Sequence, residues 1–227
     1  MVFRKSKTSR ESGAGRAGER GERPARSVAR TPKKKRPLDE TALRDLALSY
    51  VARFATTGAK LEQYLARKLR ERGVAEDADG RAITPDITGL VTRFVELGYI
   101  DDAAYARSRS RDLTARGYGA RRVERALWAA GVEEEVRQDS APGEAASRRA
   151  AAMLAQKRRF GPYAIDRGEE LGRDERHKRR EKQVAAMLRA GHLYEHVRFI
   201  LDAEEPADID EWLIEAEDDE AAGEDFR

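Results

Sequence analysis

The sequence predicts an all-α protein built from tandem three-helix repeats. Apolar residues recur at the three- and four-residue spacings of a helix face, glycines end the predicted helices at similar intervals, and no alternating strand pattern of useful length occurs. Because 40% of the residues are apolar, 38% charged and 7% aromatic, thin layers of amphipathic helix are expected rather than one thick core.

The two ends of the chain carry opposite charge. Residues 1–37 contain thirteen Lys or Arg against three Glu, with several Gly and Pro. Such a segment buries too little surface to offset the entropy of ordering, so a disordered basic arm is predicted. The arm either attracts phosphate backbones by releasing counterions or only keeps the chain soluble.

Residues 204–227 contain twelve acidic residues against Arg227 and are predicted to form an acidic tail. Its apolar residues could form a transient helix that folds back on a basic surface or meets a partner; they are Ile209, Trp212, Leu213 and Ile214.

Three helices are predicted in the first repeat. The first follows Asp39 or Thr41, either of which can cap it, and its apolar face consists of Leu43, Leu46, Ala47, Tyr50, Val51 and Phe54. The second carries Leu61, Tyr64, Leu65 and Leu69, and the third carries Ile87, Leu90, Val91, Phe94 and Val95. Thr84 as N-cap and Pro85 at the first helical position are expected to start the third helix.

The predicted helices end in a recurring pattern: an apolar residue, three further residues, then glycine. Gly73, Gly98, Gly131 and Gly191 follow it, and in a Schellman motif such a glycine takes the left-handed conformation. Gly73 and Gly131 are 58 residues apart and Gly131 and Gly191 are 60 apart, which predicts repeats at 38–100, 101–143 and 144–203. A single three-helix bundle with extra helices is the alternative.

Residues 98–106, Gly-Tyr-Ile-Asp-Asp-Ala-Ala-Tyr-Ala, join the first two predicted repeats. Asp101 is expected to cap the helix that follows, and Ile100 to pack on Tyr105 as a hydrophobic staple. Asp102 then lies in the first turn, where the helix dipole favours a negative charge. Capping accounts for both carboxylates, and no third oxygen ligand for a metal lies nearby in the sequence.

This segment resembles the signature of the RecX family. The resemblance covers about residues 40–202 and rests on Gly73, Gly98, Tyr99, Asp101, Asp102 and Tyr105, followed by Arg116-Gly117-Tyr118-Gly119, Arg122-Val123, Leu127 and Gly131-Val132. It implies three tandem three-helix repeats in an elongated, curved molecule. The turn at residues 54–60 and His192 depart from the serine-containing turn and the aromatic residue that are usual in the family.

The resemblance also implies a function. RecX-family proteins bind the filament of the RecA recombinase and usually inhibit its extension, ATP turnover, strand exchange and coprotease activity. The expected role is therefore regulation of recombinational DNA repair and of the SOS response. A basic helical protein that affects RecA only by competing for DNA is the alternative.

Basic side chains are the candidate contacts with RecA or DNA. In the second repeat they are Arg107, Arg111, Arg116, Arg121, Arg122 and Arg125, and in the third Arg179 and Arg180. Residues four apart share a helix face, so several of these form basic stripes. Tyr118 among them could stack on a base or pack in a turn. A solvated face with Glu124 and Glu181 as local partners is the alternative.

No catalytic or metal-binding pattern is present. The chain has no cysteine, phosphate-binding loop, nucleophile elbow or dinucleotide fingerprint, so a non-enzymatic protein without a cofactor is expected. His192 and His196 lack further zinc ligands, and Trp128 is expected to pack in a core or between repeats.

No apolar run has the length of a signal peptide or a membrane span. The expected protein is a cytoplasmic monomer whose partners are the RecA filament and possibly single- or double-stranded DNA.

Overall fold

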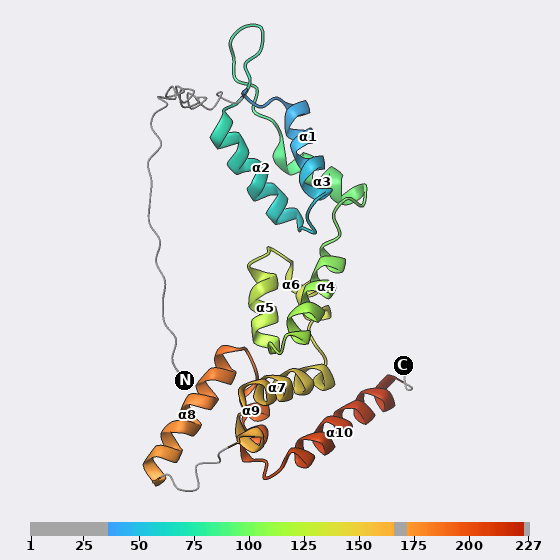
Figure 1. The fold of residues 1–227 in the computed structure, drawn as a ribbon. Helices are drawn as coiled ribbons and strands as arrows, with labels where there is room; N and C mark the ends of the chain where they lie inside the picture. Colours follow the sequence, from blue (N-terminus) through green and yellow to red (C-terminus); the bar gives the residue numbers. More distant parts are fainter. Residues whose placement is uncertain (1–35, 166–171, 225–227) are drawn as a thin grey trace, which may run out of the picture. The chain divides into compact units, whose positions relative to one another are not determined.

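The computed structural model describes residues 36–165 and 172–224 of the chain. Over these residues the chain forms ten α-helices, one 3-10 turn and two isolated β-bridges (Figure 1). The helices are α1 (Glu40–Val51), α2 (Gly58–Arg72), α3 (Ile87–Glu96), α4 (Asp102–Ala115), α5 (Ala120–Trp128), α6 (Glu134–Asp139), α7 (Glu144–Arg158), α8 (Arg173–Arg189), α9 (Tyr194–Asp202) and α10 (Pro206–Glu224), with the 3-10 turn η1 at Gly161–Tyr163. The all-α prediction is confirmed.

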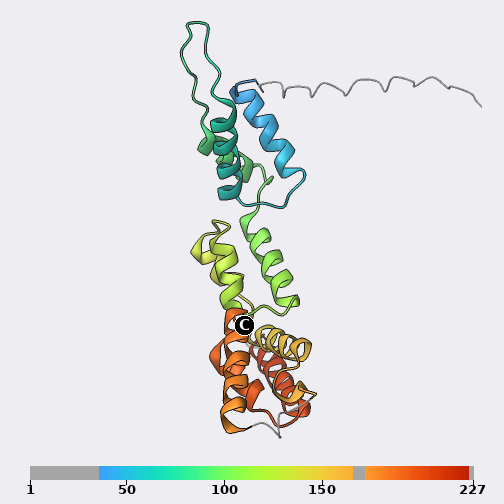
Figure 2. The same cartoon turned by 60° about the vertical axis from the view of Figure 1, so that its left-hand side comes forward.

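Three hydrophobic cores follow one another along the chain. The first lies among α1, α2 and α3 around Leu61 and Phe94, and the second among α4, α5 and α6 around Leu127. The third lies among α7, α8 and α9 around Met187 and Ile200, and it also includes residues of α10. Figures 1 and 2 show the three helices of each group side by side. Tandem three-helix repeats are therefore confirmed, whereas the elongated, curved outline stays a prediction.

Aspartate side chains start three of the helices. The carboxylates of Asp39 and Asp101 accept hydrogen bonds from the third residue along the chain, at 2.7 Å in both cases, as predicted. The predicted start of α3 at Thr84 and Pro85 is wrong. Asp86 is its N-cap and accepts from the Gly89 amide at 2.9 Å, because a carboxylate competes successfully for the free amides of a first helical turn.

The predicted helix stops are confirmed at Gly98, Gly131 and Gly191, whose φ angles are 72°, 73° and 95°. At each, the amide of the next residue donates to a carbonyl five positions earlier, as in Tyr99 to Phe94 at 2.9 Å. This is the Schellman bond. Gly73 also ends α2 with a positive φ, of 82°, but it makes no Schellman bond, because its ψ of 168° leads the chain into extended backbone that pairs with Leu38.

The basic arm predicted at 1–37 lies outside the described residues except for Arg36 and Pro37. The main-chain oxygen of Arg36 accepts a hydrogen bond from the Arg72 guanidinium at 3.0 Å. The folded unit begins at Arg36.

The acidic segment is an ordered helix rather than a tail, which corrects the prediction. Its residues Ile209, Trp212 and Ala216 are 0%, 8% and 1% exposed and lie on one face. This face packs against α7, beside which α10 runs in Figure 1. The helix that was considered for this segment thus forms, and it completes the third core.

We expect Trp212→Ala to lower the free energy of unfolding by about 3–5 kcal/mol, because removal of the buried ring leaves a cavity. Trp128 is the matched control: it was expected in a core but is 69% exposed, so Trp128→Ala should change stability by less than about 0.5 kcal/mol. Urea unfolding followed by circular dichroism measures both. Equal losses would show that α10 is not part of the core.

Candidate partner-binding surface

The second helices of the three repeats meet end to end. The Thr57 hydroxyl, at the start of α2, donates to the Ala130 carbonyl just after α5, at 2.5 Å. The Gly119 and Arg121 amides, at the start of α5, donate to carbonyls at the end of α8, at 3.0 and 3.1 Å. Terminal amides and carbonyls have no partner within their own helix. Both joints satisfy carbonyls at a helix end, the second joint also satisfies amides at the start of α5, and the helix dipoles align head to tail.

The joint between the first two repeats uses residues of the sequence signature. The Asp102 carboxylate accepts from the Gly58 amide at 3.0 Å, so it stabilises the start of α2 as well as its own helix. The Lys60 ammonium donates to the Tyr105 hydroxyl and lies 4.6 Å from the centre of its ring. Partial burial raises the pKa of Asp102, and the hydrogen bond from Gly58 offsets part of that rise.

The joint between the second and third repeats holds a buried histidine. His192 is 1% exposed, and its Nε2 lies 3.1 Å from the Gly117 carbonyl oxygen. Its Nδ1 has no hydrogen-bond partner among the described residues. Burial lowers the pKa of His192 to about 4, so the ring is neutral at pH 7 and fills the space between the repeats.

Two stop glycines lie directly against the preceding repeat. A Cβ on Gly191 would come within 2.5 Å of the Arg122 backbone nitrogen, and one on Gly131 within 2.3 Å of the Ala59 Cβ. Among the described residues, apart from its two chain neighbours, no atom would lie within 4 Å of a Cβ on Gly98, which ends α3 rather than a second helix. Glycine at the joints therefore permits both the left-handed turn and the close approach of the repeats.

Exposed arginines lie on α4 and α5. Arg107 and Arg111 form no ion pair or side-chain hydrogen bond with another described residue, and both line a cleft beside α7. On α5, Arg121 and Arg125 are also exposed. Among the predicted contacts of the second repeat, these four best match a surface open to an anionic partner.

Other predicted contacts are engaged within the chain. The Arg122 guanidinium lies 4.2 Å from the centre of the Tyr118 ring, a cation–π contact, and Arg116 pairs with Asp112 at 2.9 Å.

In the third repeat, Arg180 pairs with Asp202 at 2.6 Å and donates to the Leu201 carbonyl at 2.8 Å. Its neighbour Arg179 is half-buried and also interacts within the chain. The basic side chains of α8 were expected to form an open stripe, but Arg180 instead holds α8 against the end of α9.

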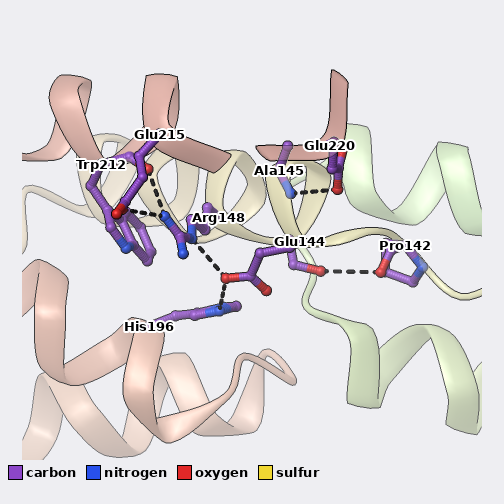
Figure 3. Close-up of polar contacts among 9 residues, drawn as sticks. Pro142, Glu144, Ala145, Arg148, His196, Trp212, Glu215 and Glu220 are labelled. Carbon is purple, nitrogen blue, oxygen red and sulfur yellow. Dashed lines mark hydrogen bonds and ion pairs between the residues drawn. The ribbon is translucent and has the colours of Figure 1, made fainter. Parts of the chain in front are cut away.

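Sequence reasoning missed a polar network between α7 and α10 (Figure 3). The Arg148 guanidinium donates to Glu144 at 2.7 Å, to the Trp212 carbonyl at 2.8 Å and to Glu215 at 3.1 Å. His196 Nε2 also contacts Glu144, at 3.1 Å. Partial burial raises the pKa of Glu144, but the hydrogen bonds from Arg148 and His196 outweigh this effect and lower the pKa overall.

Within residues 36–165 and 172–224, no group of three or more His, Cys, Asp or Glu could hold a metal ion. No helix of that part of the chain is long and apolar enough to cross a membrane.

Comparisons with known proteins agree on one family. Residues 101–140 match the family model of the second three-helix domain of RecX. The regulatory protein RecX of Myxococcus xanthus (strain DK1622) is 28% identical over 183 residues, which cover 79% of this chain and 95% of that protein.

Two crystal structures share the fold. RecX from Lactobacillus salivarius superposes with a TM-score of 0.54 at 18% identity, over 72% of this chain and 95% of that one. A second structure, of regulatory protein RecX, gives a TM-score of 0.51 at 18% identity and covers 72% of each chain.

Gly191→Ala should destabilise the protein by about 1–3 kcal/mol more than Gly98→Ala. Both substitutions place a side chain in the left-handed region, at about 1–2 kcal/mol, but only the first also forces a Cβ into the backbone of the preceding repeat. Urea unfolding of the two variants tests this difference. Equal losses would contradict the close packing at the joint.

Protonation of His192 is expected to destabilise the protein as pH falls from 6.5 to 4. The pKa of His192 in the folded chain lies below the ordinary value of 6.5. The neutral ring therefore contributes fully to the free energy of unfolding above pH 6.5, and this contribution is lost as the pH falls toward 4. The loss is about 1.4 kcal/mol for each pKa unit between the two states. His192→Gln should flatten this part of the stability profile, measured by urea unfolding at each pH. His177→Gln, at an exposed position on α8, is the control and should leave the profile unchanged.

Proposed function

Because the chain belongs to the RecX family of regulatory proteins, we propose that it regulates the RecA recombinase by binding the RecA–DNA filament. Bound there, it inhibits filament extension, ATP hydrolysis, strand exchange and coprotease activity, and thereby restrains recombinational DNA repair and the SOS response. The observation that carries this proposal is the set of exposed arginines on α4 and α5, within the segment that matches the family model.

The repeats suit a partner that is itself periodic. Each repeat contains a three-helix unit, and the second helices α2, α5 and α8 meet end to end, through a side-chain hydroxyl at one joint and backbone amides at the other. Similar units can offer similar faces to successive subunits of a filament. Several weak contacts then combine, because the first one raises the effective concentration for the others.

The arginines supply contacts of the required chemistry. A guanidinium donates charge-assisted hydrogen bonds to carboxylates and phosphates, and both groups are present on a protein–DNA filament. Exposed arginines also accelerate encounter with a negatively charged partner. We propose that the chain acts in this way as a non-enzymatic monomer in the cytoplasm, without a cofactor.

A second candidate function is binding to DNA alone, with RecA affected only by competition. The thirteen Lys or Arg in residues 1–37 favour it, because such a segment gains affinity for any phosphate backbone by counterion release.

The full-length protein is expected to lower DNA-dependent ATP hydrolysis by RecA at substoichiometric amounts. Arg121→Glu/Arg125→Glu should raise the concentration needed for half-inhibition by about tenfold or more, because it removes two charge-assisted contacts and adds repulsion. Arg44→Glu/Arg70→Glu changes the charge equally at exposed positions of the first repeat and should retain most of the inhibition. The absence of any effect at saturating protein would contradict the proposal.

Deletion of residues 1–35 separates the two candidate functions, since the folded unit begins at Arg36. If the truncated chain still inhibits RecA and captures it in the absence of DNA, the filament regulator is supported. If both properties are lost while the truncated chain remains folded, competition for DNA is the better description.

A further inference from the structure

A cleft of about 460 Å³ lies between α4 and α7, where the second and third repeats meet. Its volume falls in the range of about 300–1,000 Å³ that is typical of ligand pockets. Arg107 and Arg111 line it from α4 and Arg149 from α7, and Ala146 and Met153 contribute apolar surface. The cleft therefore combines positive charge with an apolar lining.

The positive charge of the cleft is only partly neutralised. Arg107 and Arg111 have no charged partner among the described residues, and Asp139 is the carboxylate that lines the cleft. Arg149 is held by Glu217 of α10, at 2.6 Å. Two arginines beside exposed apolar surface thus remain available, and Met153 is 43% exposed.

Helix α7 already binds one acidic amphipathic helix, α10. Carboxylates of α10 meet consecutive arginines of α7, with Glu215 on Arg148 and Glu217 on Arg149, while Trp212 is buried in the third core. Figure 3 shows the Arg148 side of this arrangement, with Trp212 and Glu215 of α10 contacting the same guanidinium. The pattern is an apolar anchor flanked by carboxylates that meet arginines.

We infer that the cleft between α4 and α7 binds an acidic amphipathic segment of a partner protein. An apolar side chain of that segment packs on Met153 and Ala146, and its carboxylates pair with Arg107 and Arg111. Single-stranded DNA could pair its phosphates with the arginines, but it has no aliphatic anchor for the apolar lining. Buried anchors with charged neighbours are typical of protein interfaces. The inference rests on the proposed function for the expectation that this partner is RecA.

Methionine methyl NMR of the full chain tests this inference, because the chain has three methionines. Met153 lines the cleft, whereas Met187 is buried in the third core and serves as an internal control. The probe is a synthetic peptide with the sequence of residues 206–224. The control peptide has the same charges but carries Ile209→Ser and Trp212→Ser, and the third probe is a short single-stranded DNA.

The expected result is a saturable shift of the Met153 signal with the first peptide and no shift of Met187. Arg107→Glu/Arg111→Glu should weaken this binding by about tenfold or more, whereas Arg44→Glu/Arg70→Glu should leave it within about twofold. Four outcomes would overturn the inference: no response of Met153, an equal response to the control peptide, an equal response to DNA, or a joint shift of Met187 that indicates displacement of α10.

This test is independent of the RecA assay. If the chain inhibits RecA but the Met153 signal does not respond to the peptide, the proposed binding site in the cleft is refuted and the proposed function is unaffected. A chain whose Met153 responds while RecA activity is unchanged would refute the proposed function and leave the peptide site intact.

Discussion

The end-to-end contact of the second helices holds the three repeats together. A helix start carries free amides and a helix end carries free carbonyls. Gly119 and Arg121 of α5 bond to the end of α8, and Thr57 before α2 bonds to the end of α5. Each repeat thereby satisfies the exposed polar groups of its neighbour, so three small cores act as one folded unit from Arg36 onward.

The joints explain why particular residue types occur where they do. Gly131 and Gly191 each end the second helix of a repeat and also lie against the preceding repeat, so both the backbone angle and the lack of space exclude a side chain there. Asp102 adds a carboxylate at the start of α2. Repeat two also presents four exposed arginines, on α4 and α5.

Helix α10 shows where composition was misleading. Its acidic residues suggested a tail, because charge repulsion and low hydrophobicity disfavour an isolated helix. In the folded chain, Ile209 and Trp212 enter the third core and Arg148 and Arg149 neutralise two carboxylates. Trp128 shows the opposite error, because an aromatic residue that was expected to be buried is exposed. It follows the buried Leu127, but successive residues of a helix are turned by about 100°, so the two side chains lie on different sides of α5.

Features that act within one or two helical turns could be predicted from the residues alone. Asp39 and Asp101 cap their helices, Gly98, Gly131 and Gly191 stop them, and the spacing of the glycines indicated the repeats. The long-range contacts could not be predicted in this way: Asp102 with Gly58, His192 with Gly117 and Arg148 with Trp212 join residues 44, 75 and 64 positions apart. Periodicity specifies which side of a helix is apolar, but the distant group that meets a given polar side chain depends on how the helices pack together.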